Sequence, residues 1–165
     1  IRIPAEDEKV YYSQDASYHV LLTAHAYDET PASVHKFLPL VTLGDSRDKF
    51  ISWGANLSDE YGNQYYTSFS PAGFFAPYAF FKLFHLPFTL NSLYIFNSIL
   101  YVLCIVLVWY LFKTLFHHSS NCCQLGLLAA ALYAFQTETL HSQGMVYWHQ
   151  SLFQLFFLLQ LICFV

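Results

Sequence analysis

Electrical charge is confined almost entirely to one end of this chain. From Tyr61 to Val165 only three residues carry a formal charge, namely Lys82, Lys113 and Glu138. A water-soluble domain carries charge over its whole surface, whereas charged groups are costly inside a bilayer. The distribution therefore predicts an all-α integral membrane protein, in which a polar extracytoplasmic loop with juxtamembrane helices precedes a transmembrane helix bundle.

The overall composition restricts the class of partner. The chain is 56% hydrophobic and 20% aromatic, and its formal net charge is -4. Binding to nucleic acid requires a basic surface, so this acidic balance excludes nucleic acid as a partner. The chain does not begin with Met, and it ends inside the apolar run 155–165. We therefore expect a fragment of a longer protein, with further membrane helices before Ile1 and after Val165.

The first region, residues 1–67, is expected to form the extracytoplasmic loop. Ser13 is a suitable N-cap, and apolar residues recur at helical spacing up to Tyr27, so the pattern predicts a short helix between these two residues. Pro31 ends this helix. A second short helix is expected near residues 34–41, within a stretch that is otherwise rich in turn-forming residues.

The second region, residues 68–90, is predicted to be an interfacial helix. It is apolar, but Pro71, Pro77 and Lys82 interrupt it. These residues favour a helix that lies on the membrane surface over one that crosses the membrane. The alternative is that this segment crosses, and the polar clusters on either side of it would then lie on opposite membrane faces.

The third region, residues 91–165, is predicted to form the transmembrane bundle. Its apolar runs are long enough for crossings at about 93–112, 125–140 and 148–165. Lys113 in the first turn agrees with the positive-inside rule, so that turn is expected to be cytoplasmic. The next turn then returns to the side that holds Asp15. We expect a bacterial inner membrane protein with its N-terminal loop in the periplasm.

Asp15 is the first candidate for catalysis. It lies in the first turn of the predicted helix, beside a segment expected to rest on the membrane. Partial burial raises the pKa of a carboxyl group and makes it a better base. The N-terminus of the helix has the opposite effect on the pKa and also attracts a lipid phosphate. The structural alternative is a carboxylate that only offsets the helix dipole.

A second polar cluster follows the second predicted crossing. Glu138 is an ionisable group near the end of an apolar helix, where such groups face protein or water. His141, His149 and Gln150 follow it closely. These groups are suited to binding a sugar or a phosphate, or alternatively to hydrogen bonds with neighbouring helices.

No spacing of histidine, cysteine or acidic residues indicates a metal site, and no glycine-rich phosphate loop or nucleophile elbow is present in the sequence. The sequence therefore indicates no certain cofactor. A requirement for a divalent metal ion is left open.

The order of the segments provides a further indication. An acidic residue opens a juxtamembrane helix (SQDASYHVLL), and a loop then leads into a proline-containing aromatic segment (GNQYYTSFSPAGFFAPYAFFKLF). A crossing and a polar turn follow, and the next helix leads to a polar edge (FQTETLHSQGMVYWHQS). This arrangement resembles the N-terminal part of the GT-C class of glycosyltransferases, in the branch of protein O-mannosyltransferases and the lipid A aminoarabinose transferase. The resemblance covers nearly the whole chain.

The resemblance implies transfer of a sugar from a polyprenyl-phosphate donor to a hydroxyl group of a protein, lipid or glycan acceptor. It also implies that Asp15 activates this hydroxyl group. Relatives often carry an acidic pair at this point and Lys-Pro at the start of the interfacial helix, whereas this chain has Ala16 and Ser70-Pro71. The residues expected to bind substrate or donor are Tyr18, His19, Lys82, Glu138, His141, His149 and Gln150.

Two other classes of function fit the same sequence. In a polytopic membrane transporter subunit, Glu138 and Gln150 would line a substrate path. In a non-catalytic membrane scaffold, Asp15 would be exposed and would line no cavity. A shared cavity for Asp15 and His149 would discriminate transfer from these alternatives.

Overall fold

The computed structural model describes residues 15–40, 42, 55–60, 62–67, 70–136, 147 and 149–165. This part of the chain is mostly helical, with a small two-stranded sheet. The elements are α1 (Asp15–Glu29), β1 (Ala55–Ser58), β2 (Gln64–Tyr66), α2 (Ala72–Leu83), α3 (Leu90–Leu115), α4 (Cys122–Phe135) and α6 (His149–Cys163).

One helix of the described part, α3, is long and apolar enough to cross a membrane. It has 26 residues, or roughly 39 Å at the rise of an α-helix, against about 30 Å for the hydrocarbon core. Only 33% of its most apolar window is buried inside the chain, unlike the core helix of a soluble protein. The helices α4 and α6 are apolar but shorter.

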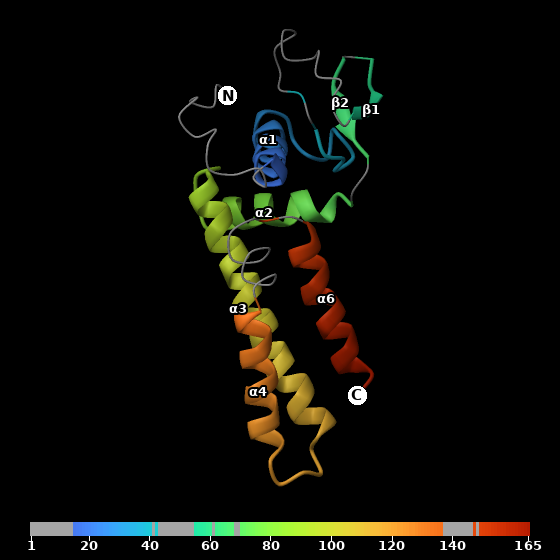
Figure 1. The fold of residues 1–165 in the computed structure, drawn as a ribbon. Coiled ribbons are helices and arrows are strands. Elements are labelled where there is room, and N and C mark those ends of the chain that lie inside the picture. The colour runs from blue at the N-terminus through green and yellow to red at the C-terminus, as the bar shows by residue number, and fades with distance from the viewer. Residues whose placement is uncertain are drawn as a thin grey trace.

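The molecule has two layers, which Figure 1 shows as an upper and a lower half. The helices α3, α4 and α6 run lengthwise through the lower half. The helix α2 lies crosswise over the upper part of α3 and α6, and α1 and the sheet lie on its other side. With 12 residues, α2 is roughly 18 Å long, which is short of a membrane crossing.

A hydrophobic core holds α1, α2, α3 and α6 together at the boundary between the two layers. Its fully buried members include Val20 from α1, Phe74 and Phe81 from α2, and Leu93 from α3. Tyr147, two residues before the start of α6, also belongs to this core. Burial of large apolar side chains from four helices fixes the position of α2 between the two layers.

Gly126 allows α3 and α4 to approach each other closely. A Cβ atom at this position would lie 2.8 Å from the backbone oxygen of Trp109 in α3, which is closer than real Cβ atoms come. The short turn between Leu115 and Cys122 keeps the two helices antiparallel neighbours. This pair makes the most extensive helix–helix contact in the described part.

The loop after α1 differs from the sequence-based expectation. The helix expected near residues 34–41 is a series of turns, in which Lys36 and Phe37 adopt left-handed φ values of 54° and 60°. Such values interrupt an α-helix. The antiparallel hairpin of β1 and β2 was not expected either, so the prediction of an all-α fold holds only in the coarser form of a mostly helical one.

The remaining boundaries lie close to the predicted ones. The first helix ends two residues later than predicted, and residues 13 and 14 of its predicted start lie outside the described residues. The helix α3 extends the predicted crossing 93–112 by three residues at each end. The helix α4 ends at Phe135, and residues 137–140 of the predicted second crossing lie outside the described residues. The helix α6 covers most of the predicted third crossing.

Candidate functional site

The first turns of α1 and α2 meet the chain just before α6 at a buried junction. The Ser17 hydroxyl of α1 donates a hydrogen bond to the Tyr147 carbonyl oxygen at 3.3 Å. The Tyr147 hydroxyl in turn donates to the Gly73 carbonyl oxygen of α2 at 2.7 Å. Ser17 and Tyr147 are both fully buried. Two hydrogen bonds therefore join three segments that are far apart in the sequence.

Pro77 explains why Tyr147 bonds to this particular carbonyl group. In an α-helix the carbonyl oxygen of Gly73 accepts a hydrogen bond from the backbone N–H of the residue four positions later. That residue is Pro77, which lies inside α2 and has no N–H. The Tyr147 hydroxyl supplies the missing donor. Burial raises the pKa of this hydroxyl group, so it stays protonated and continues to donate.

Two residues that the sequence analysis selected lie close in sequence to the junction. Asp15 is the first residue of α1 and lies two positions before Ser17. His149 is the first residue of α6 and lies two positions after Tyr147. The backbone at both positions is described, and their side chains lie outside the described part. The side chain of Tyr147, between these two positions in the junction, is wholly buried.

His19, one helical turn after Asp15, belongs to the core. Its side chain is 3% exposed, and its ring lies 4.4 Å from the Tyr66 ring and 5.7 Å from the Phe74 ring, measured between centroids. Burial lowers the pKa of His19 to about 4, so the imidazole is neutral near pH 7. Tyr18, the neighbouring candidate, is half-buried.

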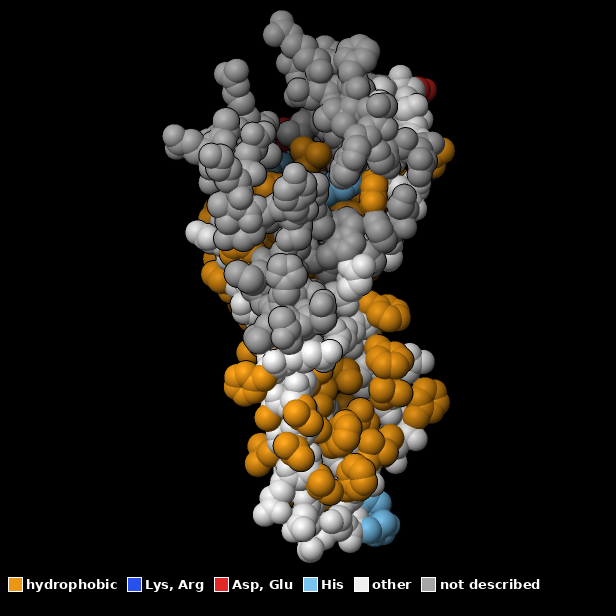
Figure 2. Space-filling view, in the orientation of Figure 1, with side chains coloured by type: hydrophobic (Ala, Val, Ile, Leu, Met, Phe, Trp, Pro, Cys, Tyr) orange, Lys and Arg blue, Asp and Glu red, His pale blue; other side chains and the backbone are white. Residues whose placement is uncertain are grey.

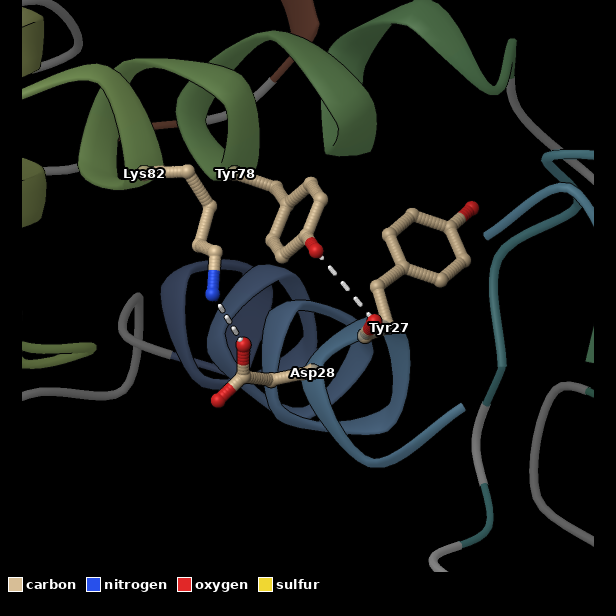
Figure 3. Close-up of polar contacts among 4 residues, drawn as sticks. All are labelled: Tyr27, Asp28, Tyr78 and Lys82. Atoms are coloured by element: carbon tan, nitrogen blue, oxygen red, sulfur yellow. Dashed lines mark hydrogen bonds and ion pairs between the residues drawn. The ribbon is translucent and has the colours of Figure 1, made fainter. Parts of the chain in front are cut away.

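Lys82 lies at the opposite end of α1 from Asp15. Its ammonium group forms an ion pair with Asp28 at 2.6 Å (Figure 3), and this pairing raises the pKa of Lys82. Beside it, the Tyr78 hydroxyl donates to the Tyr27 carbonyl oxygen at 3.2 Å. Asp28 is thirteen residues beyond Asp15 in the same helix, or roughly 20 Å along its axis. The fold therefore does not bring Lys82 to Asp15.

The remaining candidates are only partly described. Glu138 and His141 lie outside the described residues. Gln150 is exposed in the first turn of α6, and Gln154 one turn later is half-buried. The described ranges contain no group of three or more histidine, cysteine or acidic side chains suited to a metal ion.

A polar cluster that the sequence analysis missed lies at the other end of α1. The Tyr65 hydroxyl donates to an Asp59 carboxylate oxygen at 3.0 Å, and it lies 3.2 Å from Nδ1 of His35. These three residues line a cavity of about 320 Å³ between α1 and the hairpin. The sequence indicates a turn near Asp59. The contact of Tyr65 with both Asp59 and His35 depends on how the hairpin packs against the turns after α1.

Comparison of the chain with protein-family models, with curated proteins and with solved structures gave no match. A function for this chain is therefore inferred from its sequence and its geometry.

Proposed function

We propose that this chain forms part of a membrane glycosyltransferase that moves a sugar from a polyprenyl-phosphate donor to an acceptor hydroxyl group. The observation that carries the proposal is the buried junction of Ser17, Tyr147 and Gly73. It supports the view that the start of α1, which contains Asp15, lies near the start of α6, which contains His149.

The distribution of apolar surface supports a location in the membrane. Figure 2 shows hydrophobic side chains gathered over the half of the molecule that α3, α4 and α6 form. Large apolar residues on these helices are strongly exposed, among them Leu127, Leu132, Phe135 and Phe153. Such a surface is unfavourable in water and favourable in lipid. In this arrangement α2 lies along the interface, and the junction lies at the level of the lipid headgroups.

In the proposed reaction Asp15 acts as the general base. Its carboxylate accepts the proton of the acceptor hydroxyl group as that oxygen attacks the anomeric carbon of the sugar. The bond between the anomeric carbon and the phosphate oxygen breaks, and polyprenyl phosphate leaves with the bonding electrons. Attack from the side opposite the leaving group inverts the anomeric configuration. Because the phosphate is a good leaving group, the protein chiefly supplies position and charge stabilisation.

The helix ends at the junction are suited to the phosphate. The N-terminus of a helix carries a partial positive charge. Neither α2 nor α6 has an acidic residue in its first turn, so no carboxylate within these turns offsets that charge. This supports donor-phosphate binding near α2 and α6 instead of at Lys82, whose charge is balanced by Asp28.

The decisive experiment replaces the proposed base. We expect Asp15→Asn in the full-length protein to reduce sugar transfer at least a hundredfold, because general-base catalysis contributes about 10²–10⁴ in rate. Asp28→Asn is the matched control: it removes a carboxylate from the same helix, but from its exposed end. Transfer near the wild-type rate in Asp15→Asn, or an equal loss in both variants, would reject the assignment.

A further inference from the structure

The turns that follow α1 hold Phe37 in an unusual backbone conformation. Lys36 and Phe37 have φ values of 54° and 60°, a region that bulky side chains rarely adopt. Two hydrogen bonds fix Phe37 there: its N–H group donates to the Ala32 carbonyl oxygen at 2.8 Å, and its carbonyl oxygen accepts from the hydroxyl of the buried Tyr27 at 2.7 Å. A strained conformation that its surroundings maintain is typical of functional positions.

This conformation leaves an aromatic ring at the surface. The side chain of Phe37 is 45% exposed, although Ala32 and Leu40 on either side of it in the sequence belong to a buried hydrophobic cluster. The Phe37 ring contacts the ring of Phe75, in the first turn of α2, with the centroids 5.2 Å apart and the planes perpendicular. Phe75 is itself 36% exposed. Two exposed aromatic rings therefore meet beside the start of α2.

The opposite end of α2 also exposes large apolar side chains. Leu83 is 72% exposed and Phe84 is 58% exposed. Because α2 lies crosswise, its two ends are at one level of the molecule (Figure 1), roughly 18 Å apart along the helix. A protein partner covers a compact patch, whereas a bilayer surface meets the molecule along a whole level. Apolar and aromatic side chains at both ends of α2 therefore favour a lipid surface.

The charge beside Phe37 agrees with a lipid partner. Lys36 precedes Phe37 and is exposed. The ion pair between described residues, Lys82 with Asp28, does not involve Lys36. A lysine close to a phospholipid surface is attracted by the negative phosphate groups. An aromatic ring next to a lysine suits the boundary between headgroups and acyl chains, where one side chain meets lipid and the other meets phosphate.

We propose that Phe37 inserts into the headgroup region of the bilayer while Lys36 contacts a lipid phosphate. The turns after α1 then rest on the membrane and form a second anchor beside α2. This inference rests on the membrane location proposed above for α3, α4 and α6, but not on sugar transfer, because it makes no use of Asp15 or His149. The anchor would remain in a chain that transfers no sugar.

Fluorescence quenching by brominated lipids tests this proposal. The full-length Phe37→Trp protein is placed in phosphatidylcholine nanodiscs whose lipids carry bromine either near the headgroup or near the end of the acyl chain. The signal of the added tryptophan is the difference from the unmodified protein, which shares the three native tryptophans. We expect bromine near the headgroup to quench it roughly twofold more strongly, since interfacial side chains reach only about 5–10 Å into the boundary.

Two further variants locate the contact. Leu57→Trp is the matched control, because Leu57 is an exposed apolar residue of the hairpin, which lies beyond α1 from the membrane helices (Figure 1), and we expect no lipid quenching of it. In phosphatidylglycerol nanodiscs, adding Lys36→Gln to Phe37→Trp should lower the ratio of inserted to free turns about fivefold, as expected for about 1 kcal/mol per lysine.

The same measurements can overturn the proposal. Absence of quenching in Phe37→Trp, or equal quenching in Leu57→Trp, would exclude insertion of Phe37 into lipid. A shift of the emission of Phe37→Trp to shorter wavelength without quenching would mean that protein, such as a second copy of this chain, covers Phe37 instead of lipid. Quenching that Lys36→Gln leaves unchanged in phosphatidylglycerol would contradict the contact of Lys36 with phosphate.

Discussion

The imidazole of His19 lies between α1, β2 and α2, where the fold stabilises its neutral form. Burial lowers its pKa from the ordinary 6.5 to about 4. The stabilisation is fully present above pH 6.5 and is lost as the pH falls toward 4, because the charged ring would have to leave water. A shift of this size corresponds to at most about 3 kcal/mol of unfolding free energy.

The variant His19→Phe tests this linkage, because phenylalanine keeps the aromatic contacts with Tyr66 and Phe74 but does not titrate. Between pH 6.5 and pH 4 the wild type should lose up to about 3 kcal/mol more unfolding free energy than the variant. Denaturant unfolding of both proteins in the same detergent measures the difference. Parallel pH profiles would show that His19 is solvated.

At the residue scale, the sequence predicts local features better than distant contacts. Asp15 near the start of a helix follows from capping and periodicity, and Asp15 is the first described residue of α1. The burial of His19 does not follow, because it depends on Phe74 and Tyr66, more than forty residues away. The cluster of His35, Asp59 and Tyr65 escapes prediction for the same reason.

At the scale of elements, Pro77 and Tyr147 act as a pair. Pro77 deprives the Gly73 carbonyl group of its donor within α2, and the Tyr147 hydroxyl replaces it. We expect Tyr147→Phe to lower the unfolding free energy by about 1–3 kcal/mol, because it leaves a buried carbonyl oxygen without a partner. Thermal or denaturant unfolding of the purified protein measures this loss.

A double-mutant cycle separates this effect from a simple loss of packing. Pro77→Ala restores the backbone N–H that bonds to the Gly73 carbonyl group, so Tyr147→Phe should destabilise the Pro77→Ala protein less than the wild type. An equal loss of unfolding free energy in the two backgrounds would mean that the Tyr147 hydroxyl does not replace the missing donor to the Gly73 carbonyl oxygen.

The elements themselves follow from the sequence to different degrees. The apolar runs predict α3 and α6 within a few residues, because burial in lipid or protein requires continuous apolar stretches. The helix α2 lies within the predicted segment 68–90 but is shorter than that segment. The hairpin of β1 and β2 is not predicted, since its strands are short and its register is set by a turn in which Asp59 binds Asn63. Tertiary contacts here outweigh the local pattern.

At the scale of the whole molecule, the crosswise helix α2 determines which polar segments meet. Because α2 lies between the layers, the chain enters α3 and begins α6 at the same level of the molecule (Figure 1). The turn between α3 and α4 lies at the far end. If α3 crosses a membrane, the loop after α1 and the turn before α4 must then lie on opposite sides.

Labelling of single cysteines in sealed vesicles tests this arrangement. Cys123 is exposed at the start of α4, and Ser33 is exposed in the turns after α1. One variant keeps Cys123 and replaces the other three cysteines by alanine. The second replaces all four native cysteines and carries Ser33→Cys. A membrane-impermeant maleimide should label only one of these variants in intact vesicles, and both after detergent is added, since α3 of roughly 39 Å separates the two positions.

The exposed position Gln150 extends this test to the junction. If α2 lies along the interface, Gln150→Cys in the cysteine-free background should be labelled from the same side as Ser33→Cys, because α6 begins beside α1. Labelling of Ser33→Cys and Cys123 from one side, and of Gln150→Cys from the other, would mean that residues 68–90 cross the membrane. Asp15 and His149 would then lie on different faces, and no common site for sugar transfer could form between them.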